Sequence, residues 1–400
     1  MNMGTLFKYE LKKILSRKMI WILLLTSAAL ILYQNMNAIA STLGGFTQGM
    51  RDTYRIYEGR VITQASAKEA KAAFEQFALS HSDHFTTRYD ENQGTVFYFA
   101  KDYNDYYGGV AFAYIDLSYC TTVENLQQSA KDAQDTLQQG SNADGSSLSP
   151  SDKQALEAQV KNGFDTPVVH YMEGWKFLGR MPADGLFALF LLVLGLLPLF
   201  SQESSSRMEG VLLCAVERHR AAMAKMLAAA AFALGVPVLI YGFETLVLAL
   251  TYGLDGASVP ISTLYEFSFK SGGRTVGGLY ALVGLAVIAA AMASAALIAL
   301  SSSLFRNPVL SLLFTAALIA VQFLSNTFLT GIAFRGNSIN LNHLQQFINL
   351  LPAPALINVY TWIDSMRDAD LAAFALAFPA LLTSLLFWLA PRHYLKQRKA

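Results

Sequence analysis

Six long apolar stretches constrain the fold of this chain more than any other feature. Each meets or approaches the roughly 20 apolar residues that a helix needs to cross a hydrocarbon core about 30 Å thick. The six stretches cover residues 19–37, 183–200, 226–252, 276–305, 308–333 and 371–390. The sequence therefore predicts an all-α polytopic membrane protein with six transmembrane helices.

The composition agrees with a membrane protein and argues against several other classes. Of the 400 residues, 53% are hydrophobic and only 15% are charged, whereas about a quarter of the residues of a soluble protein are charged. The formal net charge of +1 gives no basic excess that would predict nucleic acid as a partner. Two cysteines are too few for a disulfide framework or a zinc site, and we expect no metal.

Residues 1–18 have the pattern of an amphipathic basic helix. Apolar residues recur at helical spacing with basic residues on the remaining faces, among them Phe7, Leu11, Ile14, Lys12 and Arg17. Such a helix lies at the membrane interface and leads into a first span at 19–37. A soluble tail with a stop-transfer charge cluster is one alternative. A signal peptide cleaved near residue 40 is another.

The distribution of charge predicts the orientation of the chain. With the amino terminus inside, the inner segments carry 14 basic and four acidic residues; these segments are 1–18, 201–225, 304–308 and 391–400. Residues 38–182 instead carry 12 basic and 18 acidic residues. Because cytoplasmic segments retain Lys and Arg, we expect a multi-pass protein of the cell membrane with both termini in the cytoplasm.

Residues 38–182 are long enough for a separate extracellular domain. Its predicted helices cover residues 65–80, 122–139 and 149–161. The aromatic-rich segment 95–119 includes weak strand-like alternation at 110–117, so a mainly helical domain with some β structure is expected. The aromatic residues suit either a tyrosine-rich core or a ligand-binding surface. The His81–His84 segment does not complete a metal site by its spacing.

The sequence contains no recognisable catalytic motif. It lacks the phosphate-binding G-x-x-x-x-G-K-[ST] as well as H-E-x-x-H and G-x-S-x-G. We therefore expect a non-catalytic chain without a cofactor of its own. Within the six apolar stretches the only charges are Asp184, at the start of the second, and Glu244, inside the third. Glu244 either lines a translocation pathway or accepts hydrogen bonds from hydroxyls such as that of Thr245.

The inner loop at 201–225 has the most specific pattern in the chain. It combines a Glu-Gly step, a Leu-Leu pair, two arginines and a lysine at the entry to the next span: Glu209, Gly210, Leu212, Leu213, Arg218, Arg220 and Lys225. This loop resembles the cytoplasmic loop of the permease subunits of ABC-2 type (type V fold) ABC transporters. The basic interfacial helix, the six spans, the large insertion after the first span and the segment at 350–354 extend the resemblance, which covers the chain outside residues 38–182.

The resemblance implies that these seven loop residues couple the chain to a separate ATPase. The loop would form a short helix that docks on a cytoplasmic ABC ATPase subunit, which binds ATP and Mg. The chain would be the permease of a bacterial exporter of amphipathic or hydrophobic peptides, drugs or lipids, and would pair with a second copy or a related permease in contact with membrane lipid. Many permeases of this family have a Pro-x-Ser-Arg turn in the loop. The corresponding residues 216–220 here read Val-Glu-Arg-His-Arg, so the resemblance does not indicate which arginine makes the docking contact.

Two other interpretations of the same features remain. The basic residues of the loop satisfy the topology rule by themselves, without any docking role. The main alternative function is a membrane-anchored sensor or interaction protein that binds a ligand through residues 38–182, with the spans serving as a scaffold.

Overall fold

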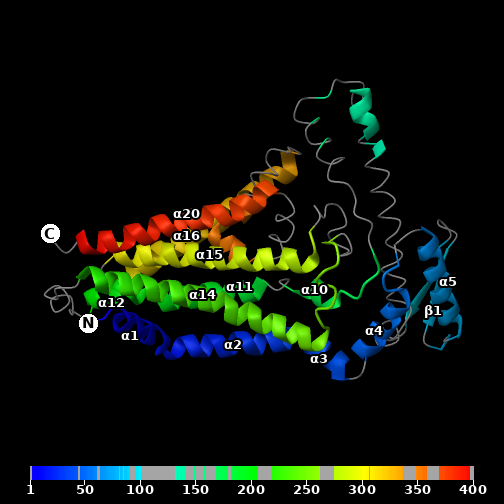
Figure 1. Ribbon diagram of the computed structural model, residues 1–400, viewed down its shortest axis with the longest axis horizontal. Coiled ribbons are helices and arrows are strands. Elements are labelled where there is room, and N and C mark those ends of the chain that lie inside the picture. Colours follow the sequence, from blue (N-terminus) through cyan, green and yellow to red (C-terminus); the bar gives the residue numbers. More distant parts are fainter. Residues whose placement is uncertain are drawn as a thin grey trace. The chain divides into compact units, whose positions relative to one another are not determined.

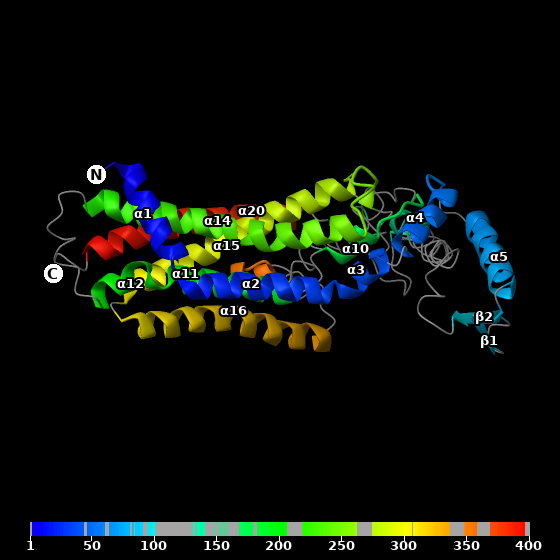
Figure 2. The same cartoon turned by 90° about the horizontal axis from the view of Figure 1, so that it is seen from below.

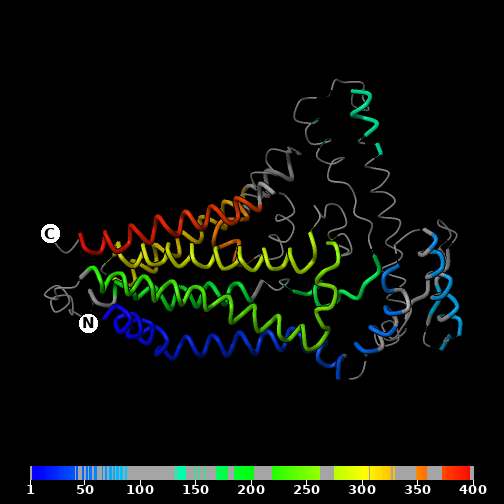
Figure 3. Tube along the Cα trace, viewed as in Figure 1, coloured from blue at the N-terminus to red at the C-terminus, as the bar shows by residue number. Residues whose placement is uncertain are grey.

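The computed structural model describes most of the apolar part of the chain and portions of the polar part. The described residues are 2–43, 46–60, 64–80, 82–83, 85–90, 95–100, 131–132, 134–140, 148, 153, 157, 168–178, 182–205, 218–261, 274–305, 307–336, 348–357 and 369–396. Figure 3 draws the other residues in grey. Of the predicted helices at 122–139 and 149–161, only a part of the first and two residues of the second fall within these ranges.

The described chain is mostly helical, and five of its segments are long and apolar enough to cross a membrane. They lie in α11 (Pro182–Leu196) with α12 (Pro198–Ser205), α14 (Arg218–Thr251), α15 (Val276–Leu304), α16 (Pro308–Gly336) and α20 (Ala369–Lys396). A sixth candidate is the pair α1 (Met3–Leu15) and α2 (Lys18–Gln34), which is bent by 63°. The prediction of an all-α membrane chain thus agrees with five helices and one bent pair.

Two compact units divide the chain. Unit 1 comprises Met1–Asn35, Leu178–Val247 and Tyr280–Ala400. Within it α2, α14, α15, α16 and α20 run beside one another, and α11 packs against α2 and against the short helix α18 (Pro352–Ile357). Figures 1 and 2 show α1, α12, the start of α14 and the end of α20 at the same end of this unit.

A short buried helix completes the core of unit 1. All six residues of α18 are buried, and the helix begins at Pro352, a residue suited to the first helical position because it lacks an N–H. The Gln322 side chain of α16 accepts a hydrogen bond from the backbone N–H of Ala353 at 3.1 Å. The segment at 350–354 thus contains the start of a short helix that packs against α11 and α16.

Unit 2 comprises Met36–Phe177 and Leu248–Leu279. Its described helices are α3 (Met36–Leu43), α4 (Phe46–Tyr57), α5 (Gln64–Ser80) and α10 (Glu173–Phe177). The helix predicted at 65–80 is thus confirmed as α5. Side chains of Tyr54 from α4 and of Tyr171 and Met172, just before α10, form part of its core.

An antiparallel hairpin in unit 2 lies earlier in the sequence than the predicted strand. β1 (Phe85–Asp90) pairs with β2 (Thr95–Ala100), with Phe85 opposite Ala100 and Asp90 opposite Thr95. Alternation at residues 110–117 was the signal for a strand, and those residues lie outside the described ranges. β2 reads Thr-Val-Phe-Tyr-Phe-Ala, a run of β-branched and aromatic residues that favours a strand without alternating polarity.

Candidate functional site

Helix α1 joins α2 through a sharp bend that is stabilised by local hydrogen bonds. Ser16 ends α1, with its N–H bonded to the Lys12 carbonyl at 2.8 Å and its hydroxyl donating to the Lys13 carbonyl at 3.1 Å. Arg17 is extended, and the Trp21 indole donates back to the Leu15 carbonyl at 2.7 Å. These bonds satisfy carbonyls at the end of α1, which fixes the helix at an angle to the span.

Arg17 binds the backbone at the break between α11 and α12. Pro198 separates α11 from α12, and because proline has no N–H it leaves the carbonyl of Leu194 without its usual helical donor. The Arg17 guanidinium donates to this carbonyl at 2.9 Å and to that of Gly195 at 2.6 Å. A side chain predicted to lie at the membrane interface therefore caps the end of α11.

Ser302 of α15 stabilises the same break from the opposite side. Its hydroxyl donates to the Leu197 carbonyl at 2.6 Å and accepts from the N–H groups of Phe200 and Ser201 at 3.0 and 3.3 Å. A hydroxyl that both donates and accepts suits a broken helix, where carbonyls and N–H groups are freed together. Ser302 thereby joins α15 to the α11–α12 break.

A buried ion pair joins α1 to the start of α14. The Lys225 ammonium lies 3.3 Å from the Glu10 carboxylate and donates to the Leu199 carbonyl of α12 at 3.1 Å. Lys225 is only 1% exposed and Glu10 only 9%, so each charge is stabilised mainly by the other and by backbone dipoles. We call Glu10, Arg17, Lys225 and Ser302, with the α11–α12 break, the polar hub.

The seven predicted coupling residues fall into two groups. The stretch Glu209, Gly210, Leu212 and Leu213 lies outside the described residues. The other three belong to α14, which begins at Arg218 and so starts before the apolar stretch at 226–252. Arg220 is exposed, whereas Lys225 is buried against Glu10. Its contact with the interfacial helix makes Lys225 part of the polar hub.

The predicted residues of the interfacial helix divide between two faces. Ile14 is 1% exposed, Phe7 and Leu11 are half-buried, and Lys12 is exposed. Arg17, predicted on the basic face, is half-buried and bonded to the end of α11. Sequence reasoning did not single out Glu10 or Ser302 for the hub. The signals available were a carboxylate within a basic helix and a Ser-Ser-Ser run at the end of an apolar stretch, at 301–303.

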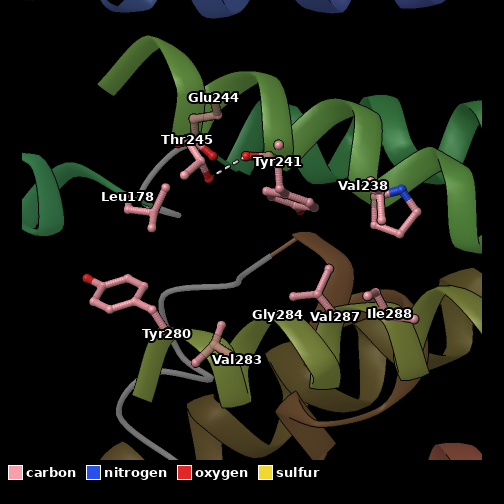
Figure 4. Close-up of a pocket in the computed structure, with 12 residues that line it drawn as sticks. Leu178, Val238, Tyr241, Glu244, Thr245, Tyr280, Val283, Gly284, Val287 and Ile288 are labelled. Carbon is pink, nitrogen blue, oxygen red and sulfur yellow. Dashed lines mark hydrogen bonds between the residues drawn. The ribbon is translucent and has the colours of Figure 1, made fainter. Parts of the chain in front are cut away.

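A second feature of unit 1 is a cavity of about 300 Å³ between α14 and α15. Figure 4 shows Tyr241 and Thr245 of α14 on one side and Tyr280 and Val283 of α15 on the other. Most of its lining is apolar, and the carboxylate of Glu244 contributes the formal charge. The volume is in the range of small-molecule sites.

Hydrogen bonds hold the polar side chains of this wall. The Tyr241 hydroxyl donates to the Leu356 carbonyl of α18 at 2.7 Å. The Thr245 hydroxyl donates to the Tyr241 carbonyl at 2.6 Å, so it does not donate to Glu244 as one prediction allowed. Glu244 is 2% exposed and lies in the wall of a cavity, the setting in which an ionisable residue of a membrane helix is usually functional.

Comparison of the chain with models of protein families, with curated proteins and with solved structures found no match. The class of protein is therefore defined by the helices themselves. Five long apolar helices, or six with the bent pair, are those of a helical multi-pass membrane protein.

Proposed function

We propose that this chain is the transmembrane permease subunit of an ATP-driven exporter whose ATPase is a separate chain. The polar hub is the observation that carries the proposal. The predicted docking loop lies between α12 and α14, and Lys225 connects these two helices to Glu10 of α1. A displacement of the loop by an ATPase would pass directly to the interfacial helix and to the broken second span.

The cavity beside Glu244 is the proposed position of the substrate. Its largely apolar wall suits an amphipathic or hydrophobic molecule such as a peptide, a drug or a lipid. Two such chains, identical or related, would enclose a pathway in the cell membrane. ATP and Mg would be bound by the partner, and both termini would lie in the cytoplasm with the basic inner segments.

The alternative function, a ligand-binding sensor, is favoured by one observation. Unit 2 contains its own polar cavity of about 380 Å³, lined by side chains that include Arg51 and His170. A sensor would use this cavity without an ATPase. The two proposals differ in whether an ATPase binds to the loop.

Charge reversal at the start of α14 tests the exporter. The double variant Arg218→Glu/Arg220→Glu is co-purified with the candidate ATPase, and its ATP hydrolysis is measured in lipid nanodiscs. We expect at least a tenfold loss of ATPase retention, because truncation or reversal of charges at a docking site weakens binding strongly. The matched control is Arg392→Glu/Lys396→Glu, which reverses two charges at the end of α20.

Two results would count against the exporter. Equal retention of the ATPase by both double variants would show that the basic start of α14 makes no docking contact. Failure of any ATPase to associate with the unaltered chain, combined with ligand binding to unit 2, would favour the sensor.

A further inference from the structure

Unit 2 contains a cavity that is independent of the proposed transport pathway. Its walls come from the second half of α4, from residues 170–171 and from the turn at 255–256, and its volume is about 380 Å³. Unlike the cavity beside Glu244, much of its accessible lining is polar. All of its lining residues belong to unit 2.

Ion pairs and backbone bonds position the polar lining. Arg51 donates to the Tyr252 carbonyl at 2.6 Å and lies 3.4 Å from the Asp255 carboxylate. Nδ1 of His170 lies 2.9 Å from the Glu58 carboxylate. The N–H of Gly59 bonds to the Val169 carbonyl at 3.0 Å, which holds the segment before His170 against the end of α4.

Two glycines allow the turn to approach these side chains. Gly253 and Gly256 have φ of +82° and +77°, a region that favours glycine. A Cβ on Gly253 would overlap the guanidinium of Arg51, and a Cβ on Gly256 would lie 2.8 Å from Nε2 of His170. The absence of both side chains leaves room for the arginine and the imidazole at the cavity wall.

Among the described residues, three buried polar atoms of the lining have no hydrogen-bond partner: Arg51 Nε, His170 Nε2 and Tyr171 Oη. Tyr171 is 5% exposed. More than 90% of buried polar groups in proteins are paired, so three at one cavity call for an explanation. Because the side chains that carry these atoms line the cavity, small rotations would present the atoms to a molecule bound there.

The phenol of Tyr171 is suited to act as a donor. Burial raises the pKa of Tyr171 above its usual range; the negative charge of Glu173 acts in the same direction, and the positive charge of Arg51 offsets only part of this effect. The hydroxyl therefore keeps its proton. The Arg51 guanidinium lies 5.5 Å from the centre of the same ring, so both donors belong to neighbouring side chains of the lining.

The charges of the lining are balanced. Two guanidinium groups, of Arg51 and Arg55, are matched by the carboxylates of Glu58 and Asp255. A simple anion or cation would meet a like charge in such a cavity, whereas a molecule with both charges finds a partner for each. We propose that this cavity binds a small zwitterion, with its anionic oxygen group on Arg51 and Tyr171 and its ammonium group on Glu58 and Asp255.

Binding of a dipeptide to the full chain in lipid nanodiscs tests the proposal. The probe is glycyl-phenylalanine, titrated by calorimetry beside its N-acetylated and C-amidated forms, each of which lacks one charge. We expect the free dipeptide to bind and each blocked form to bind about tenfold more weakly or worse, because charge-assisted hydrogen bonds are lost. No ATPase is present, so the result does not depend on the exporter proposal.

The variant Tyr171→Phe tests whether the dipeptide binds in the cavity of unit 2. By distance and angle, no described residue bonds to the Tyr171 hydroxyl, and Arg51 is only a weak neighbour, so the thermal stability is expected to change little. The affinity for the dipeptide is expected to fall roughly 3- to 10-fold. Tyr33→Phe is the matched control: it removes an exposed hydroxyl in unit 1, away from both cavities, and should leave the stability and the affinity unchanged.

Each possible result either supports or overturns the proposed zwitterion site. Glycerophosphoethanolamine, titrated in parallel, carries the same pair of charges as a phospholipid headgroup, and tighter binding of this probe would support the zwitterion site with lipid as its source. Absence of binding by both zwitterions, equal binding of the blocked dipeptides, or unchanged affinity in Tyr171→Phe would overturn the proposal.

Discussion

At the residue scale, the backbone hydrogen bond that is lost at Pro198 is replaced by a side chain from a distant segment, Arg17. Proline removes the donor that the Leu194 carbonyl would have in a continuous helix. Arg17 supplies two N–H groups at 2.9 and 2.6 Å to this carbonyl and its neighbour. Arg17 thus replaces the hydrogen bond that the proline removes.

This relationship predicts coupling between two substitutions. Arg17→Ala is expected to lower the free energy of unfolding by about 1.5–3 kcal/mol, the range for hydrogen bonds from a charged group. Pro198→Ala restores a backbone donor to the Leu194 carbonyl, so Arg17→Ala should cost at least ~0.5 kcal/mol less in that background. The free energies of unfolding of the unaltered chain, the two single variants and the double variant, measured at equilibrium in mixed micelles, give the coupling energy.

Pro379→Ala in α20 provides the control for this cycle. It also removes a proline inside a helix, but at a site with no described bond to Arg17. Its effect should add to that of Arg17→Ala. If both prolines give the same coupling energy, Arg17 is not specific for the carbonyl that Pro198 frees.

At the scale of elements, the packing of α11 against α18 depends on one glycine. A Cβ on Gly185 would overlap the Leu356 carbonyl oxygen and lie 2.7 Å from the carbonyl carbon. Backbone atoms of a buried helix cannot rotate away as a flexible side chain can. Gly185 therefore sets how closely α18 approaches α11.

Gly185→Ala is accordingly expected to destabilise unit 1. We expect a loss of about 1–3 kcal/mol, the usual cost of overpacking a core. Gly235→Ala in α14 is the matched control, because a Cβ there meets nothing within 4 Å. It should be neutral or stabilising by roughly 0.5–1 kcal/mol, because alanine favours the helix. Thermal unfolding of both variants checks the difference, and equal melting temperatures would contradict it.

The helices differ in how well the sequence patterns predicted their bounds. Long apolar runs located α14, α15, α16 and α20, because a span must be apolar along its whole length. The start of α14 was missed, since residues 218–225 read Arg-His-Arg-Ala-Ala-Met-Ala-Lys, too polar to belong to an apolar stretch. Helix-forming residues continued the helix where hydrophobicity ended.

At the scale of the whole molecule, Glu244 provides a test of the transport pathway. Glu244→Gln keeps the size of the side chain and removes its charge. If the cavity holds the substrate, we expect about a tenfold loss of ATP-driven ethidium uptake by inverted vesicles containing the chain and its ATPase, with little change in thermal stability. Tenfold corresponds to about 1.4 kcal/mol, the scale of one charged contact.

Thr245→Val is the control for this prediction. Thr245 lines the same cavity, but its hydroxyl is bonded to the carbonyl of Tyr241 in its own helix. Its loss should leave uptake unchanged. A parallel fall of stability and uptake in Glu244→Gln would instead assign Glu244 a structural role.

The sequence by itself determined the class of this chain and the amphipathic character of residues 1–18. These properties follow from local composition and period, which any helix imposes on its own residues. The sequence also selected Glu244, because a charge within an apolar run is visible without a fold.

Only the tertiary structure determines which charged side chains lie in contact with one another. Lys225 had the sequence pattern of an exposed docking cation, yet it is buried against Glu10 and the Leu199 carbonyl. The cavity of unit 2 likewise combines α4, residues 170–171 and the turn at 255–256. Neither site follows from spacing along the chain, because the free energy of a buried charge depends on partners brought together only by packing.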